Sequence, residues 1–143
     1  MKKAIKSLFM SLALLTSTIV SAADYVIDTK GAHAFINFKV SHLGISWITG
    51  GFNEFEGTFS YDKSDITATK INVDINPASI DTNHAERDKH LRSGDFLNVD
   101  EYSTAKFVST KVNEVGENNI QVIGDFTLNG VTNSITINAN KIG

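Results

Sequence analysis

The chain has 143 residues, of which 41% are hydrophobic and 20% charged, with no cysteine and a formal net charge of −3. This composition is typical of a single globular domain, and the lack of cysteine excludes a disulfide scaffold, a thiolate metal site and a cysteine nucleophile. Because nucleic-acid binders carry a basic surface, the mild acidity argues against that class of protein.

The first 22 residues have the pattern of an export signal. Three lysines within the first six residues precede an apolar run from Leu8 to Val20, and small residues follow it. This order predicts a secretory signal peptide, residues 1–22, with cleavage near Ala22 or Ala23. A retained membrane anchor is the alternative, but the apolar stretch is shorter than the ~20 residues that a spanning helix needs.

Cleavage at this point would leave one mature domain, residues 23–143. The signal holds three basic and no acidic residues, so the mature chain has 10 basic and 16 acidic residues and a formal net charge of −6. Freedom from cysteine suits an oxidising compartment. We therefore expect a periplasmic protein without a stable membrane anchor.

From residue 34 onward, apolar and polar residues alternate with a period of two, which predicts antiparallel β-strands. Asn129-Gly130 predicts a type I′ turn between the last two strands, because both residues accept positive φ angles. In residues 105–112 either alternate set fits an inward face, so the orientation of that strand stays open. The other alternating runs are residues 36–42, 54–61, 70–76, 120–128 and 131–139.

The predicted fold class is all-β, an antiparallel sheet that closes into a barrel. No long helical pattern is available to cover the apolar face of the sheet, so the sheet must cover itself as a sandwich or a barrel. Long strands joined by hairpins favour the barrel. We see no linker or internal repeat, which predicts one domain.

One densely charged segment, residues 81–92, lacks the two-residue period. Thr82 as N-cap and Gly94 as stop signal predict a short helix that crosses one end of the barrel. After this helix, the apolar residues Phe96 and Leu97 are expected to return the chain to the core and pack there.

Catalytic residue types cluster only in this charged segment. His84 and Asp88 are four residues apart, as are Glu86 and His90, so each pair shares a helix face at a spacing that metal sites use. No HExxH motif is present and no third ligand is implied. We expect a solvated ion-pair network, with no catalytic residue, metal or cofactor. A hydrolase or metal-dependent enzyme using His84, Asp88 and His90 is the alternative.

His33 and His42 bracket a predicted strand. A place at the barrel mouth or in the core accounts for each histidine better than metal binding does. Trp47, close to Gly44 and Gly50, is expected either at the rim or as a plug of the barrel, with simple packing as the equal alternative.

The apolar residues expected to face inward predict a ligand site. A small barrel either fills its interior with side chains or leaves room for one ligand. A hollow apolar tube would select a rod-shaped lipid, because each buried methylene contributes about 0.8 kcal/mol. The predicted pore-lining residues are Ile36, Phe38, Val40, Phe55, Phe59, Ile71, Val73, Phe107, Ile120, Val122 and Phe126.

Several motifs of the mature chain resemble the YceI-like periplasmic proteins: residues 24–28, 33–38, 42–47, 51–59, 81–97 and 124–132. The resemblance implies a lipocalin-like barrel with an elongated apolar pore that binds polyisoprenoid lipids, such as polyprenols or quinones. It implies no firmly attached enzymatic reaction and no catalytic motif. It favours the hollow barrel and an isoprenoid lipid as the partner.

Barrels of this family continue beyond the position where the present chain ends. About six long strands are predicted here, whereas a small closed barrel has about eight. We therefore expect the last strands of the barrel to be missing and an open edge that permits aggregation, strand exchange or a homodimer. The predicted function is periplasmic transport or sequestration of an isoprenoid lipid; a filled barrel that binds other proteins is a further alternative.

Overall fold

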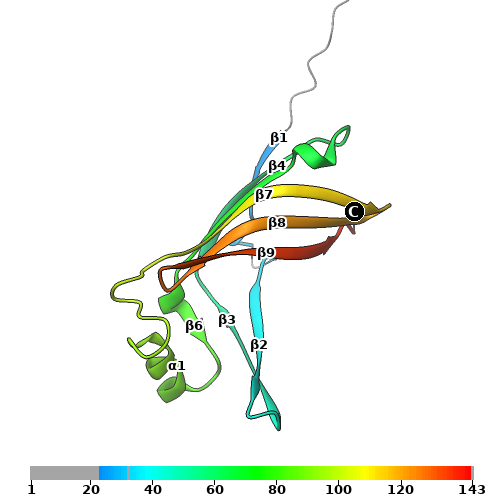
Figure 1. Ribbon diagram of the computed structural model, residues 1–143. Helices are drawn as coiled ribbons and strands as arrows, with labels where there is room; N and C mark the ends of the chain where they lie inside the picture. Colours follow the sequence, from blue (N-terminus) through cyan, green and yellow to red (C-terminus); the bar gives the residue numbers. More distant parts are fainter. Residues whose placement is uncertain (1–22, 32, 143) are drawn as a thin grey trace, which may run out of the picture.

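Two antiparallel sheets make up the structure, a computed structural model that describes residues 23–31 and 33–142 (Figure 1). The larger sheet has the strand order β1-β4-β5-β7-β8-β9, and the smaller has the order β2-β3-β6. The strands are β1 Ala23–Val26, β2 Ile36–His42, β3 Ser46–Phe52, β4 Phe55–Tyr61, β5 Lys70–Ile75, β6 Ile80–Asp81, β7 Ala105–Gly116, β8 Asn119–Leu128 and β9 Val131–Asn140. The helices are η1 Ile66–Ala68, η2 Pro77–Ser79 and α1 Ala85–Arg92.

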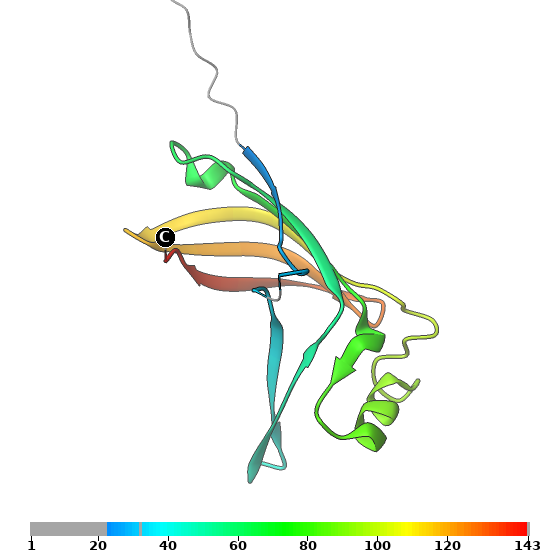
Figure 2. The ribbon, with the colours of Figure 1, turned by 180° about the vertical axis from the view of Figure 1, so that it is seen from behind.

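The predicted all-β class with one short α-helix is confirmed. The larger sheet is strongly curved, and the hairpin of β2 and β3 projects away from it (Figures 1 and 2). Within the described residues, β1 and β9 are the outer strands of the larger sheet and do not pair with each other. Closure into a barrel therefore stays a prediction, and the signal peptide lies outside the described residues.

The two sheets meet at a corner that the chain passes twice. On one pass β3 leads into β4 through Asn53 and Glu54; on the other, β5 leads into β6 through Asn76 and η2. The Asn53 amide donates to the Ser79 carbonyl at 3.2 Å, and the Asn76 amide donates to the Glu54 carbonyl at 2.9 Å. The Asn76 side-chain amide also donates to the Glu54 carboxylate at 2.7 Å. These bonds hold the passes side by side.

The apolar residues of neighbouring strands lie opposite one another in the larger sheet. Phe59 is paired with Ile71, and Phe107 is paired with both Val73 and Phe126. Directly opposed residues point to the same face of a sheet. One face of the larger sheet, called the inner face below, therefore collects most of the apolar side chains of its strands.

A β-bulge in β7 resolves the orientation that the sequence left open. Ser109 pairs with Gly124 and Lys111 with Ile123, so Thr110 has no partner of its own in β8. One extra residue reverses the alternation along a strand. Phe107 before the bulge and Val112 after it both lie on the inner face and are buried. Odd-numbered residues of β7, such as Phe107, therefore face inward before the bulge, and even-numbered residues, such as Val112, face inward after it.

The predicted turn between β8 and β9 is confirmed. Leu128 pairs with Val131, and the two residues between them, Asn129 and Gly130, have φ angles of 49° and 72°. Positive φ at both positions is the requirement of a type I′ turn.

Helix α1 is present, but the prediction of Thr82 as its N-cap is wrong. His84 is the N-cap, and its Nδ1 accepts a hydrogen bond from the Arg87 amide at 3.2 Å. The Thr82 hydroxyl instead donates to the Asp88 carboxylate. The helix ends at Arg92, two residues before the predicted stop at Gly94. No helix in the described ranges is long and apolar enough to cross a membrane.

We predict that Gly124→Ala destabilises the protein by about 1–3 kcal/mol, because overpacking displaces close neighbours. A Cβ at Gly124 would lie 2.5 Å from the Phe107 ring and 2.6 Å from the Val108 carbonyl oxygen. Gly94→Ala is the matched control, since its nearest contact would be Asn98 at 3.8 Å. Urea unfolding measures the effect, and equal losses of stability in the two variants would contradict this account of Gly124.

Candidate functional site

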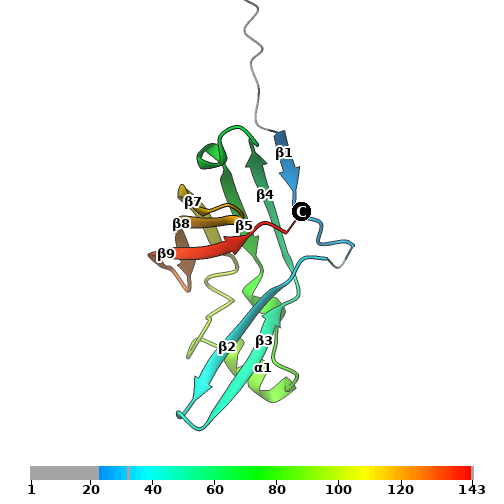
Figure 3. The ribbon, with the colours of Figure 1, turned by 90° about the vertical axis from the view of Figure 1, so that its right-hand side faces the viewer.

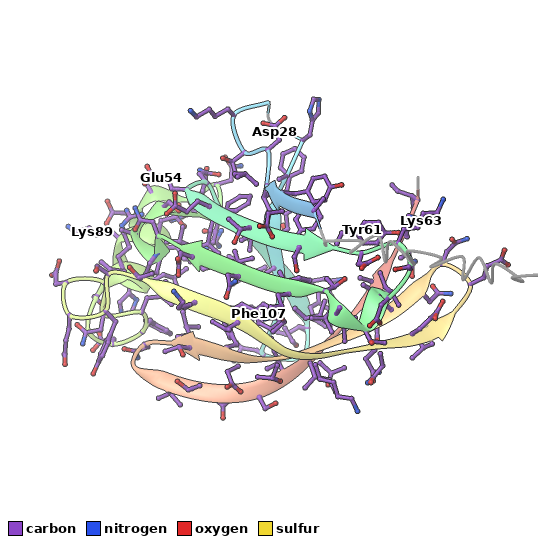
Figure 4. The ribbon with its side chains drawn as sticks, turned by 90° about the horizontal axis from the view of Figure 1, so that it is seen from above. Asp28, Glu54, Tyr61, Lys63, Lys89 and Phe107 are labelled. Carbon is purple, nitrogen blue, oxygen red and sulfur yellow. The ribbon has the colours of Figure 1, made fainter. Side chains whose placement is uncertain are left out.

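The inner face of the larger sheet holds the largest apolar cluster of the described chain. Phe107, Val112 and Val122 are buried at its centre. Figure 4 shows Phe107 between the two ends of the sheet, with Tyr61 and Lys63 at one end and Glu54 at the other. The half-buried residues that pack against this centre are Ile71, Val73, Ile120, Phe126 and Ile135.

A cleft of about 610 Å³ opens at the Tyr61 end of the inner face. This volume lies within the range of small-molecule sites, which are roughly 300–1,000 Å³. The apolar part of its lining comes from five of the six strands and from η1: Tyr25, Phe59, Tyr61, Ile66, Ile71, Ile120 and Ala139. The cleft can therefore accept an apolar chain that runs along the sheet.

Polar residues form the rim of this cleft. Lys141 donates a hydrogen bond to the Tyr61 hydroxyl at 2.9 Å, and Lys63, Glu114 and Glu117 lie around the same opening. Thr69, 8% exposed, also lines the cleft, and its hydroxyl has no hydrogen-bond partner within the described residues. The site is thus apolar inside and hydrogen-bonding at its mouth.

Two local features shape this end of the sheet. Asp65 caps η1 by accepting a hydrogen bond from the Thr67 amide at 3.0 Å, which orders the connection between β4 and β5. On the edge strand β1, Tyr25 stacks on Phe59, with ring centroids 5.0 Å apart and an interplanar angle of 13°. The stacked pair forms one wall of the cleft.

The structure places eight of the eleven predicted pore residues on the inner face. Three of them, Phe59, Ile71 and Ile120, line the cleft itself. Ile36, Phe38 and Val40 lie instead on β2 of the smaller sheet. Contact of any of the eleven with a ligand stays a prediction. The eight are Phe55, Phe59, Ile71, Val73, Phe107, Ile120, Val122 and Phe126.

Sequence reasoning missed Tyr25, Val112 and Ile66 as parts of this surface. Val112 was not identifiable, because the bulge at Thr110 reverses the alternation that the prediction followed. Tyr25 belongs to a strand of four residues, too short for a period to be visible. Ile66 lies in a 3₁₀ turn, where strand alternation gives no information.

The charged segment forms local hydrogen bonds, to the Thr82 hydroxyl and to backbone groups, in place of the expected solvated ion-pair network. Asp88 is buried and accepts from the Thr82 amide at 3.0 Å as well as from the Thr82 hydroxyl. Arg87 donates to the Thr82 hydroxyl and carbonyl, both at 2.7 Å, and Arg92 donates to the Ile80 carbonyl at 3.3 Å. These bonds fix the entry into α1.

The three residues of the enzyme alternative are each engaged separately. His84 caps α1, Asp88 accepts from Thr82, and His90 Nε2 lies 3.1 Å from an Asp95 carboxylate oxygen. In the described part of the chain, no group of three or more histidine, aspartate or glutamate side chains is arranged to hold a metal ion.

The remaining candidates lie on the surface. His33 and His42 are both exposed, so neither occupies a core. Trp47 is 61% exposed and lies on the face of the β2–β3 hairpin opposite to Phe38 and Val40. The alternative that Trp47 simply packs in the interior is wrong for the described residues, whereas its place at the rim or as a plug of a closed barrel stays a prediction.

Residues 25–143 match the family model of the YceI-like domain. The chain belongs to the YceI-like family. A UPF0312 protein of Vibrio vulnificus (strain YJ016) is 54% identical over 143 residues, which are 100% of the present chain and 76% of that protein. The family was identified from the sequence motifs, and that prediction is confirmed.

Solved structures share the fold. BcnA of Burkholderia cenocepacia aligns with a TM-score of 0.71 at 22% identity, covering 76% of this chain and 69% of that one. A polyisoprenoid binding domain from Saccharophagus degradans, implicated in plant cell wall breakdown, aligns with a TM-score of 0.51 at 19% identity, covering 87% and 67%. At these identities the likeness establishes the fold alone.

We predict that Asp88→Asn lowers the unfolding free energy at pH 7 by about 1–3 kcal/mol, since the buried group loses charge-assisted hydrogen bonds. Hydrogen bonds from Thr82 hold the pKa of Asp88 below its ordinary value in the folded protein. The contribution of Asp88 is therefore complete above about pH 5 and is lost as the pH falls through its folded pKa.

Urea unfolding between pH 7 and pH 3 tests this prediction. The Asp88→Asn variant should lose less stability on acidification than the unsubstituted protein. Asp125→Asn, which alters an exposed carboxylate on β8, is the control and should keep the original profile. Parallel pH profiles for all three proteins would refute the role of Asp88.

Proposed function

We propose that the protein binds an isoprenoid lipid, a polyprenol or the tail of a quinone, against its inner face and carries or sequesters it in the periplasm without chemical conversion. The observation that carries the proposal is the cleft of about 610 Å³, which continues the apolar inner face and has a hydrogen-bonding mouth. An isoprenoid has the matching division into a long apolar chain and one polar end.

The physical driving force is the burial of methylene and methyl groups. Each contributes about 0.8 kcal/mol before the entropic cost of ordering the chain. Phe59, Ile71 and Ile120 offer the apolar contacts, while the exposed Lys141–Tyr61 pair is available to a hydroxyl or carbonyl group at the mouth. The relative named as a polyisoprenoid binding domain is consistent with this class of ligand.

We predict that replacing Ile71 and Ile120 together by serine weakens farnesol binding about 10- to 100-fold, because apolar contact in the cleft is lost. Val108→Ser/Ile123→Ser is the matched control. Both residues are half-buried and lie on the opposite face of the sheet, Val108 on β7 and Ile123 on β8. Isothermal titration calorimetry measures both affinities, and unfolding midpoints check the fold.

Equal weakening in both double variants would contradict binding at the inner face. Native mass spectrometry of the purified chain, followed by solvent extraction, should also find a co-purifying isoprenoid. A chain that is folded yet binds neither farnesol nor an extracted lipid would support the alternative of a filled module for protein interaction.

We predict that His84→Ala/His90→Ala leaves farnesol affinity unchanged, since both histidines belong to the α1 segment and not to the cleft lining. Calorimetry and elemental analysis of bound metal measure the outcome. A bound metal ion that disappears with both histidines, together with loss of a hydrolytic activity, would favour the enzyme alternative instead.

A further inference from the structure

An exposed apolar tip ends the β2–β3 hairpin. Leu43 is 83% exposed, Ile45 84% and Trp47 61%, and Val40 adds a further exposed apolar side chain on β2. The hairpin projects away from the larger sheet in all three ribbon views, and its turn lies far from the end of the sheet at which the cleft opens (Figures 1, 2 and 3). The tip is thus separate from the proposed lipid site.

The backbone at this turn holds Leu43 in an unfavourable conformation. Four non-glycine residues have positive φ in the described chain: three are asparagines, which tolerate this region, and the fourth is Leu43 with φ 54°. Positive φ is uncommon for a residue with a bulky side chain. Against the described residues, the exposed Leu43 gains no burial to offset this cost, so strain at the tip points to a role in contact with another molecule.

The charge distribution indicates the chemistry of the partner. Residues 29–53, which include the whole hairpin, contain two lysines and two histidines, whereas all 16 acidic residues of the chain lie elsewhere. Lys39 Nζ lies 4.4 Å from the centroid of the Trp47 ring. Tryptophan with a neighbouring lysine suits a membrane interface, where the ring sits at the headgroup level and the amine reaches phosphate.

The shape of the tip favours a bilayer over a protein partner. A stable protein interface buries about 800 Å² on each side and uses roughly 20–30 residues. The hairpin turn presents a few apolar side chains on a narrow projection, which fits insertion between lipid headgroups. Anchors that combine apolar insertion with electrostatic attraction bind anionic bilayers reversibly.

We infer that the β2–β3 hairpin docks the protein onto an anionic lipid bilayer, with Leu43 and Ile45 inserted, Trp47 at the interface and Lys39 beside the headgroup phosphates. The docking is reversible and needs no spanning segment. The inference goes beyond the proposed binding of an isoprenoid, and it stands on residues that do not line the cleft.

Trp47 is the single tryptophan of the chain and reports the docking directly. Vesicles of phosphatidylethanolamine and phosphatidylglycerol should shift its emission to shorter wavelength and should co-sediment with the mature protein. Leu43→Ser/Ile45→Ser should weaken this binding roughly tenfold or more, because two inserted side chains lose their apolar contact with the lipid. Val115→Ser/Val131→Ser is the matched control, since these valines are 57% and 59% exposed at other places, and it should bind as before.

The contribution of charge is measured separately. Lys39→Gln, raised salt, or vesicles of phosphatidylcholine alone should each weaken the binding, because Coulomb attraction to anionic headgroups is removed or screened. Circular dichroism and unfolding midpoints confirm that each variant folds. Unchanged vesicle binding in Leu43→Ser/Ile45→Ser would overturn the inference.

A concentration-dependent shift of Trp47 emission without vesicles, abolished by the tip variant, would also overturn it in favour of a second copy of the chain. The test remains separable from the proposed function. The tip variant should keep its farnesol affinity, and a protein that docks on vesicles but binds no farnesol would refute only the isoprenoid proposal.

Discussion

The larger sheet depends on one constraint: each strand must present its apolar residues on the same side as its neighbours. A one-residue slip would move a whole strand's apolar set to the solvent. Phe107, opposed by Val73 on one side and Phe126 on the other, links three strands in this alignment. The bulge at Thr110 preserves it along the twelve residues of β7. Without cysteine, non-covalent interactions alone maintain this arrangement, including the ion pair between Lys106 and Asp74 that joins β7 to β5.

Alternation with a period of two was sufficient to predict most strands and the Asn129-Gly130 turn, because both are local properties of the chain. It failed where one residue changes the parity, as at Thr110. It also could not identify the short strand that carries Tyr25, whose place is set by pairing with the distant Phe59. The sequence therefore predicted which residues share an apolar face of the sheet. It could not predict the cleft, which forms where the strand ends and η1 come together.

The charged segment shows a different limit of sequence reasoning. The spacing of His84 and Asp88 predicts a common helix face, but His84 precedes the helix as its N-cap and is exposed, whereas Asp88 lies within the helix and is buried. Thr82 donates hydrogen bonds to the Asp88 carboxylate and accepts one from the Arg87 guanidinium. These bonds centre the hydrogen-bond network at the start of the helix on Thr82. Competition between side chain and backbone for the same groups decides this outcome, and residue spacing carries no information about it.

The corner between the sheets fixes the orientation of the β2–β3 hairpin relative to the larger sheet. Because the chain crosses it twice and Glu54 is bonded to Asn76 through both main chain and side chain, the hairpin is not a free arm on a flexible joint. A molecule that stands on the tip of this hairpin would hold its curved sheet at a set height and tilt above the supporting surface. The direction in which its cleft opens would then be fixed by four residues remote from that cleft: Asn53, Glu54, Asn76 and Ser79.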